Sequence, residues 1–169
     1  SQGTCTRGFG GPSSSGLGVA VRGDMIVELS LATAMVLATV TIHGTGLMIL
    51  GRMLASLDER GGAAQMSPLS WHGWFVTVAV VMGLFLLHGL EIWLYALLFS
   101  KLGAVPEFRE AVYFSTSSYG SIGYGDSAIA GQWKLLGAIE GINGSILLGW
   151  SVAFFVTVMA RMLPPLTRR

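Results

Sequence analysis

Three long stretches of mostly apolar residues limit what this chain can fold into. They run from about Met25 to Leu50, from Trp74 to Phe99 and from Trp133 to Met159. Each is long enough for a membrane-spanning helix, which needs roughly 20 mostly apolar residues. Charged residues make up only 11% of the chain, whereas soluble domains carry about a quarter. The sequence therefore predicts an all-α integral membrane protein with three transmembrane helices.

Polar segments divide these stretches into units. Residues 1–24 are rich in glycine and serine, and we expect them to form a flexible tail. We expect residues 25–54 to form the first transmembrane helix, followed by a turn-rich polar loop. Residues 71–160 contain the other two spans and form a second unit, and residues 161–169 form a short tail.

Composition argues against several classes of function. The net charge is +1 and no basic cluster is present, so we expect membrane lipids rather than nucleic acid as a partner. The single cysteine, Cys5, leaves no intrachain disulfide and no thiolate metal site. No catalytic constellation and no cofactor-binding motif is present in the sequence. We therefore expect neither an enzyme nor a resident cofactor.

The segment between the second and third spans predicts a short helix that cannot cross the membrane. It extends from Glu107 to about Ser118 and is preceded by Pro106. Proline suits the first turn of a helix, and Glu107 and Glu110 complement the positive amino-terminal end of the helix dipole. A short helix followed by a glycine-rich run predicts a re-entrant loop, and such backbone survives at membrane depth only inside protein or beside water.

The run Ser121-Ile-Gly-Tyr-Gly-Asp126 follows this short helix. Two glycines that flank one tyrosine let the backbone alternate between negative and positive φ. Alternation of this kind aims successive carbonyl oxygens toward one axis. A ring of such carbonyls can replace the hydration shell of a cation.

This run resembles the selectivity filter of the potassium-channel superfamily. Residues 74–159 are similar to the two-helix pore module of small bacterial potassium channels of the ion-transport and two-pore type, and the first span is an addition to that module. The resemblance implies that Asp126 lies at the filter mouth and that K⁺, the permeant ion, is bound by the filter. The implied coordinating residues are Ser121, Ile122, Gly123, Tyr124 and Gly125.

The resemblance also implies a homotetramer, because one filter strand cannot surround an ion, and passive K⁺ flux across a bacterial inner membrane. Two departures from the family pattern leave alternatives open: Gly120 stands where threonine is usual, and Ser121 replaces the commoner threonine. The alternatives are a weakly selective cation channel and a non-conducting subunit packed in a larger membrane complex.

Arginines indicate an orientation. If the filter faces outward, the tail after Ala160 is cytoplasmic. The inner segments then carry five lysines and arginines and the outer ones three when residues from Met25 onward are counted, and the two sides are equal when Arg7 and Arg22 are included. The arginines of the inner segments are Arg52, Arg60, Arg161, Arg168 and Arg169.

The third span carries small residues at every fourth position, which lets helices approach closely in lipid. These residues are Gly137, Gly141, Ser145, Gly149 and Ala153. Gly144 and Gly149 are also candidate hinges for bending of this inner helix. Glu140 and Asn143 are polar residues of the same span, and we expect them to support the filter or to face a water-filled cavity.

His88 and Glu91 lie one turn apart on the second span, and His43 lies on the first. Three interpretations are open for this group. The first is an interhelical hydrogen bond that fixes the first helix against the other two. The second is a proton-sensitive cluster, since histidine titrates near neutral pH, and the third is a metal site.

Overall fold

The computed structural model describes residues 14–61, 70–123 and 128–162. In the first of these ranges, side chains are described only for residues 25–56. Within these ranges the chain is helical and contains no strand. The elements are α1 (Ser14–Gly61), α2 (Trp71–Lys101), α3 (Phe108–Tyr119), η2 (Gly131–Trp133) and α4 (Lys134–Met162). The predicted fold class, an all-α membrane protein, is confirmed.

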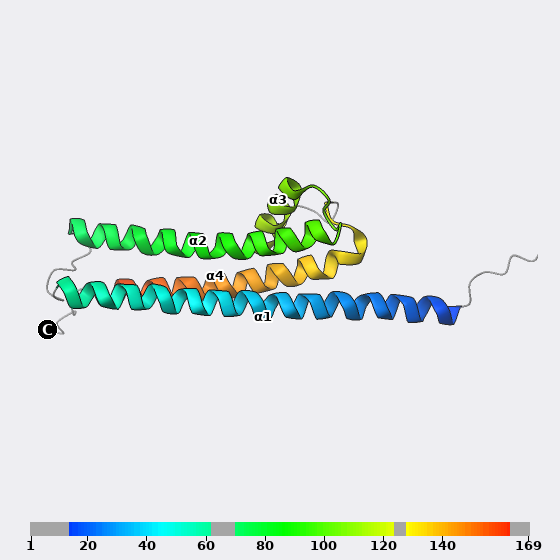
Figure 1. The fold of residues 1–169 in the computed structure, drawn as a ribbon, viewed down its shortest axis with the longest axis horizontal. Helices are drawn as coiled ribbons and strands as arrows, with labels where there is room; N and C mark the ends of the chain where they lie inside the picture. The colour runs from blue at the N-terminus through cyan, green and yellow to red at the C-terminus, as the bar shows by residue number, and fades with distance from the viewer. Residues whose placement is uncertain (1–13, 62–69, 124–127, 163–169) are drawn as a thin grey trace, which may run out of the picture.

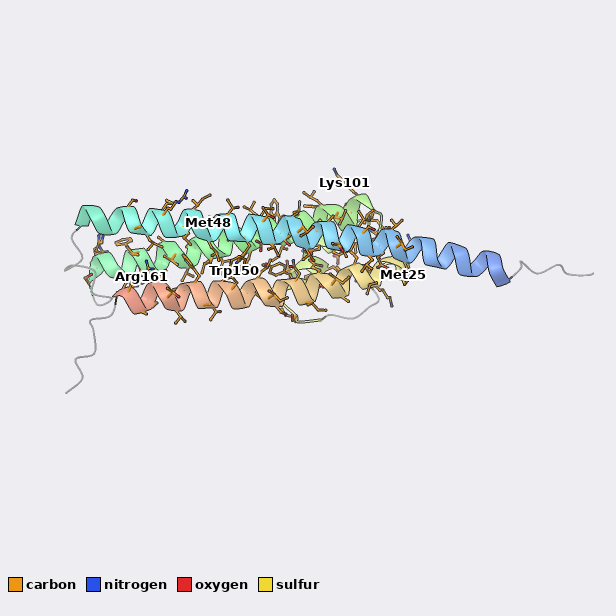
Figure 2. All side chains as sticks on the ribbon, turned by 90° about the horizontal axis from the view of Figure 1, so that it is seen from below. Met25, Met48, Lys101, Trp150 and Arg161 are labelled. Carbon is orange, nitrogen blue, oxygen red and sulfur yellow. The ribbon has the colours of Figure 1, made fainter. Side chains whose placement is uncertain are left out.

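Helices α1, α2 and α4 lie side by side, and the short helix α3 lies at one end of the bundle (Figure 1). Helices α1 and α4 run in the same direction and α2 runs opposite to them. Met25 and Lys101 lie toward the α3 end of the bundle, and Arg161 lies at the other end (Figure 2). The α3 end is therefore one membrane face of the molecule and the Arg161 end is the other.

Three segments of the described chain are long and apolar enough to cross a membrane: Met25–Ser56, Trp71–Lys101 and Gly131–Met162. Their outer surfaces expose large apolar side chains, among them Leu37, which is 65% exposed, and Phe85, which is 73% exposed. In water such a surface would aggregate, whereas in lipid it contacts acyl chains at no cost. The three predicted transmembrane helices are thus confirmed.

Helix α1 begins earlier than the sequence suggested. It starts at Ser14, inside the segment predicted to be a flexible tail, and its first turns project beyond the other helices (Figure 1). Once the span has formed, each further residue adds a hydrogen bond without a new nucleation cost, which explains the extension. The remaining residues of the predicted tail, 1–13, lie outside the described part of the chain, as do residues 163–169 of the predicted C-terminal tail.

Local signals define both ends of α2. The Ser70 side chain accepts a hydrogen bond from the Gly73 amide at 3.0 Å and caps the first turn. After Lys101 the chain reverses at Gly103, whose φ of 65° favours glycine. The Ala104 amide then donates to the Phe99 carbonyl at 2.9 Å, which turns the chain back toward α3.

The bundle contains two apolar clusters. One includes Tyr95, Phe99, Ala111 and Leu136 and lies at the α3 end. The other contains the buried residues Leu47, Val76, Val80, Leu84, Leu87 and Met162. Buried polar side chains, including His43 and Glu91, occupy the helical positions between the two clusters.

Polar contacts join α1 to α4. A carboxylate oxygen of Glu28 accepts a hydrogen bond from the Leu136 amide at 2.9 Å, which satisfies an amide in the first turn of α4. About two turns further along α4, the Asn143 side-chain amide donates to the Thr39 hydroxyl at 2.8 Å. Buried polar partners of this kind fix the register of two helices, so α1 is an integral part of the bundle rather than a peripheral anchor.

Candidate functional site

Helix α3 is the short, non-spanning helix that the sequence predicts, shifted by one residue. It begins at Phe108 with Glu107 as N-cap, so Pro106 precedes the cap instead of occupying the first turn. Glu107 makes no side-chain capping bond, but its carbonyl accepts from the Ala111 amide at 2.9 Å. The helix ends at Tyr119, which delivers the chain to the predicted filter.

Glycines of α4 make room for α3. An added Cβ at Gly137 would lie 3.0 Å from the Phe114 ring, and one at Gly141 would lie 3.1 Å from the Ser118 carbonyl oxygen. At Gly144 it would lie only 2.2 Å from the Tyr119 carbonyl oxygen. Part of the face of small residues on α4 is thus the surface against which the short helix α3 packs.

The two candidate hinges differ in their surroundings. Gly144 lies against the backbone of Tyr119, whereas an added Cβ at Gly149 would meet no atom within 4 Å. Gly144 therefore has a packing reason to be glycine, which the sequence reading did not assign to it. Nothing in the packing around Gly149 requires glycine, and its hinge role stays a prediction.

The first residues of the predicted filter adopt an unusual backbone. Gly123 has a φ of 69° and Ser121 a φ of 56°, so the left-handed region is visited twice in three residues. Gly120, one of the two departures from the family pattern, has an ordinary φ of −74° and forms the C-cap of α3. Tyr124, Gly125 and Asp126 lie outside the described residues.

Hydrogen bonds hold these residues against the end of α3. The Ile122 amide donates to the Ser117 carbonyl at 2.9 Å, and the Ser121 amide donates to the Ser118 carbonyl at 2.9 Å. The Ser121 hydroxyl lies 2.6 Å from the Ser145 hydroxyl on α4. Contacts with α3 and with α4 thus hold Ser121 in the left-handed conformation. They compensate for the free-energy cost of that conformation.

Glu140 is fully buried and contacts the short helix. One of its carboxyl oxygens is hydrogen bonded to the Ser115 hydroxyl, which also lies 2.9 Å from the Ile92 carbonyl oxygen. That hydroxyl has a single hydrogen, and the carbonyl can only accept. Both contacts are satisfied together only when the Glu140 carboxyl carries a proton and donates it to Ser115.

Replacing Glu140 with glutamine is therefore expected to preserve the structure. A glutamine N–H would donate to the Ser115 hydroxyl, and its carbonyl would replace the carboxyl oxygen Oε2, which has no hydrogen-bond partner among the described residues. Glu140→Leu removes the donor and should lower the free energy of unfolding by about 1 kcal/mol, the usual net value of one hydrogen bond. Unfolding in detergent measures both. A Gln variant as unstable as the Leu variant would show instead that a carboxylate charge is needed there.

Asn143, the other polar residue predicted on α4, contacts no residue of the predicted filter in the described part of the chain. Besides its bond to Thr39, its side-chain amide lies 3.3 Å from the Tyr95 hydroxyl. Asn143 therefore joins α1, α2 and α4 and supports the bundle. The first helix thus interacts with the inner helix at the level of the short helix.

The three residues proposed as a cluster do lie together. The His43 imidazole and Glu91 are joined through Nδ1 and Oε1 at 3.0 Å, and both side chains are fully buried. His88 Nδ1 lies 3.5 Å from the second carboxylate oxygen of Glu91. Potential ligand atoms of the three residues lie within 4.8 Å of one another.

Two further residues, which the sequence reading missed, complete this cluster. The Tyr119 hydroxyl donates to Glu91 Oε2 and lies 2.9 Å from His88 Nδ1. The Ser151 hydroxyl lies 2.9 Å from His88 Nε2 and 3.2 Å from His43 Nε2. Glu91, His43, Ser151, His88 and Tyr119 thus form a closed circle of hydrogen bonds, here called the polar ring, that joins all four α-helices.

A signal for the missed residues is present in the sequence. Ser151 lies eight residues after Asn143, so the two share the inner face of α4. Tyr119 is a polar aromatic residue at the end of a short helix between two spans, and its hydroxyl requires a partner when it is buried. The helical period identifies these positions as inward-facing but does not identify their partners.

Comparison with known proteins gives a family match over the region from α2 to α4, which contains the short helix and the predicted filter. Residues 75–161, more than half of the chain, match the sequence model of a family described as ion channel. The match begins in α2, includes α3 and the predicted filter, and ends in α4, so α1 lies outside it. No curated protein and no solved structure matches the chain.

Proposed function

Because the chain belongs to the ion channel family, we propose that it is one subunit of a potassium-selective channel built from four identical chains. Each subunit contributes one filter strand, and K⁺ passes down its electrochemical gradient. K⁺ is the permeant ion and not a resident cofactor, and we expect no enzymatic activity.

The backbone at the end of α3 is the observation that carries this proposal. A non-spanning helix between two spans delivers the chain to Ser121 and Gly123, both with positive φ. Such alternation is what a short strand needs in order to turn its carbonyl oxygens toward one axis. Ser121, Ile122 and Gly123 are exposed in the single chain, which agrees with a strand that lines a pore only when four copies meet.

The roles of the individual residues follow from this assembly. The carbonyl oxygens of the filter residues bind dehydrated K⁺ in successive rings, and Asp126 attracts cations at the outer mouth. The coordinating residues are Ser121, Ile122, Gly123, Tyr124 and Gly125. Since a single chain supplies one strand, the ring is complete only in the tetramer.

Charge supports an orientation with the C-terminus in the cytoplasm of a bacterial cell and the filter facing outward. Arg161 lies at the end of the bundle opposite Lys101 and α3 (Figure 2). Arg52, near the end of the first span, is exposed. Arginines beside the ends of spans favour the cytoplasmic side.

Flux from liposomes that contain the purified chain tests the proposal. We expect K⁺ flux well above Na⁺ flux, block of the K⁺ flux by Ba²⁺, and a mass of four chains in native mass spectrometry. Equal flux of both ions would indicate a weakly selective cation channel and would contradict the selectivity. A verified tetramer without any flux would contradict conduction, and a single copy that associates only with other proteins would indicate a subunit of a larger complex.

A further inference from the structure

The polar ring contains more hydrogen bonds than its residues have protons to fill. Five contacts close the circle: Glu91 to His43, His43 to Ser151, Ser151 to His88, His88 to Tyr119 and Tyr119 to Glu91. Each contact needs one hydrogen. Two neutral imidazoles, one serine and one tyrosine supply four, and an ionised carboxylate supplies none.

We propose that the polar ring is a binding site for a single proton, which closes the circle and neutralises it. When His88 holds the proton, its two N–H groups donate to Tyr119 and Ser151, Ser151 donates to His43, and His43 and Tyr119 donate to Glu91. When Glu91 holds the proton, Glu91 donates to Tyr119 and Tyr119 donates to His88, while the other contacts stay as before. Both arrangements contain five protons.

Because the polar ring is buried, lacking the fifth proton costs free energy. His43 and Glu91 are 0% exposed and Tyr119 is 1% exposed, so the ring is shielded from water. Without the extra proton one contact lacks a hydrogen, and the ring carries a net negative charge inside a membrane-spanning bundle. An uncompensated charge and an unsatisfied polar contact are both costly there. His88, with a side chain 13% exposed, is the most accessible member by which the proton can enter.

The surroundings contain no charge that would take over this role in the described part of the chain. The other titratable side chains that are buried among the described residues are Glu28 on α1, Tyr95 on α2 and Glu140 on α4. Each is hydrogen bonded outside the ring, to Leu136, Asn143 and Ser115 respectively. On the α4 side the Trp150 ring packs 5.5 Å from the His43 ring, which adds apolar cover.

A proton is a better occupant than a metal ion. All four imidazole nitrogens and both carboxylate oxygens are already engaged in contacts within the ring. A metal ion would have to displace several of these bonds at once. A proton instead supplies the one hydrogen that the circle lacks.

The ring connects the proton to the pore loop. Tyr119 is the last residue of α3 and stands two positions before Ser121. Its hydroxyl contacts Glu91 and His88 on α2. Ser151 and His43 continue the polar ring to α4 and α1. Loss of the proton as pH rises therefore removes one link between the end of the short helix and the rest of the bundle.

Proton counting by NMR tests the proposal independently of ion flux. The chain has three histidines, so ¹⁵N-histidine-labelled protein in lipid nanodiscs gives few signals, and a His72→Gln variant identifies those of His72. With ¹³C-labelled glutamate, we expect His43, His88 and Glu91 together to release one proton in a single step as pH rises. Release of two or more protons, or none between pH about 5 and 9, a window around the usual histidine pKa of about 6.5, would overturn the proposal. A change in these signals on adding Zn²⁺ at fixed pH would also overturn it, in favour of a metal site.

Glu91→Gln is the most informative variant. A glutamine carbonyl accepts from His43 and its N–H donates to Tyr119, so five hydrogens are present without an extra proton. We expect the histidine signals of this variant to stay unchanged across the pH range in which the parent protein titrates. Glu140→Gln is the matched control, since it alters a buried carboxyl outside the ring, and it should leave the titration in place. A Glu91→Gln variant that still titrates like the parent would contradict the assignment.

Tyr119→Phe provides a second variant should Glu91→Gln fail to fold. It removes two contacts and leaves three, which the hydrogens of His43, Ser151 and His88 fill. The buried Glu91 carboxylate, however, loses the hydrogen bond from Tyr119 and keeps its charge. We therefore expect this variant to bind the proton still and to release it at a higher pH than the parent protein, and release at the parental pH or below it would contradict the assignment. If the proposed channel function holds, the pH dependence of K⁺ flux should follow the same titration and disappear in Glu91→Gln. Absence of flux would affect only that last expectation, because the NMR titration stands without it.

Discussion

Replacing Gly123 with alanine is expected to abolish K⁺ flux and leave the helices intact. Gly123 has a φ of 69°, a region in which a residue with a Cβ loses roughly 1–2 kcal/mol. An added Cβ would meet no atom within 4 Å, so the effect comes from the backbone conformation and not from a collision. In the proposed tetramer, relaxation to a negative φ would turn the adjoining carbonyl away from the pore axis in every subunit. Liposome flux, measured beside circular dichroism, separates loss of conduction from loss of folding.

Gly131→Ala is the control for this variant. Gly131 is also a glycine with open space around it, but its φ is not positive, and it lies in η2, outside the predicted filter residues 121–126. We expect parental flux from Gly131→Ala. Potassium-selective flux from Gly123→Ala at the parental level would show that the filter does not require the left-handed conformation at this position.

Replacing Gly144 with alanine should have the largest effect on assembly. The added Cβ would lie 2.2 Å from the Tyr119 carbonyl oxygen and 2.9 Å from its carbonyl carbon, both backbone atoms that cannot rotate away. Helix α3 must therefore move off α4, and the hydroxyl of Tyr119 would leave the polar ring with it. Overpacking costs typically about 1–3 kcal/mol and sometimes more, and here it adds to the loss of two hydrogen bonds. We expect a lower unfolding temperature in detergent and failure to assemble into the proposed tetramer.

Gly149→Ala is the matched comparison on the same helix. Since no atom lies within 4 Å of the added Cβ, we expect the unfolding temperature to stay the same or rise, as alanine favours helix over glycine. If Gly149 is a hinge, K⁺ flux will change in this variant while stability does not. A Gly144→Ala protein as stable as Gly149→Ala would contradict the close approach of α3 and α4.

The spans and the short helix could be predicted because their signals are local. Apolar length alone identifies the second span, predicted over residues 74–99 and found at Trp71–Lys101, and the turn-forming Gly103 and Pro106 separate it from α3. The start of α1 could not be placed, because a glycine-rich polar segment does not reveal that an adjoining span will extend the helix into it. The positive φ of Ser121 could not be predicted either, because a serine in the sequence gives no signal for that conformation.

The sequence by itself determined that the chain is helical, that it crosses a membrane three times, and that a glycine-rich loop stands between the last two spans. These properties depend on composition, on the length of apolar stretches and on backbone freedom. All three can be read from residues that are neighbours in the sequence. Only the tertiary structure decided that Glu140 bonds Ser115, that Gly144 seats Tyr119, and that His43, His88 and Glu91 close a ring with Tyr119 and Ser151. Those partners come from different helices, and which faces meet is set by the packing of the whole bundle and not by any one segment.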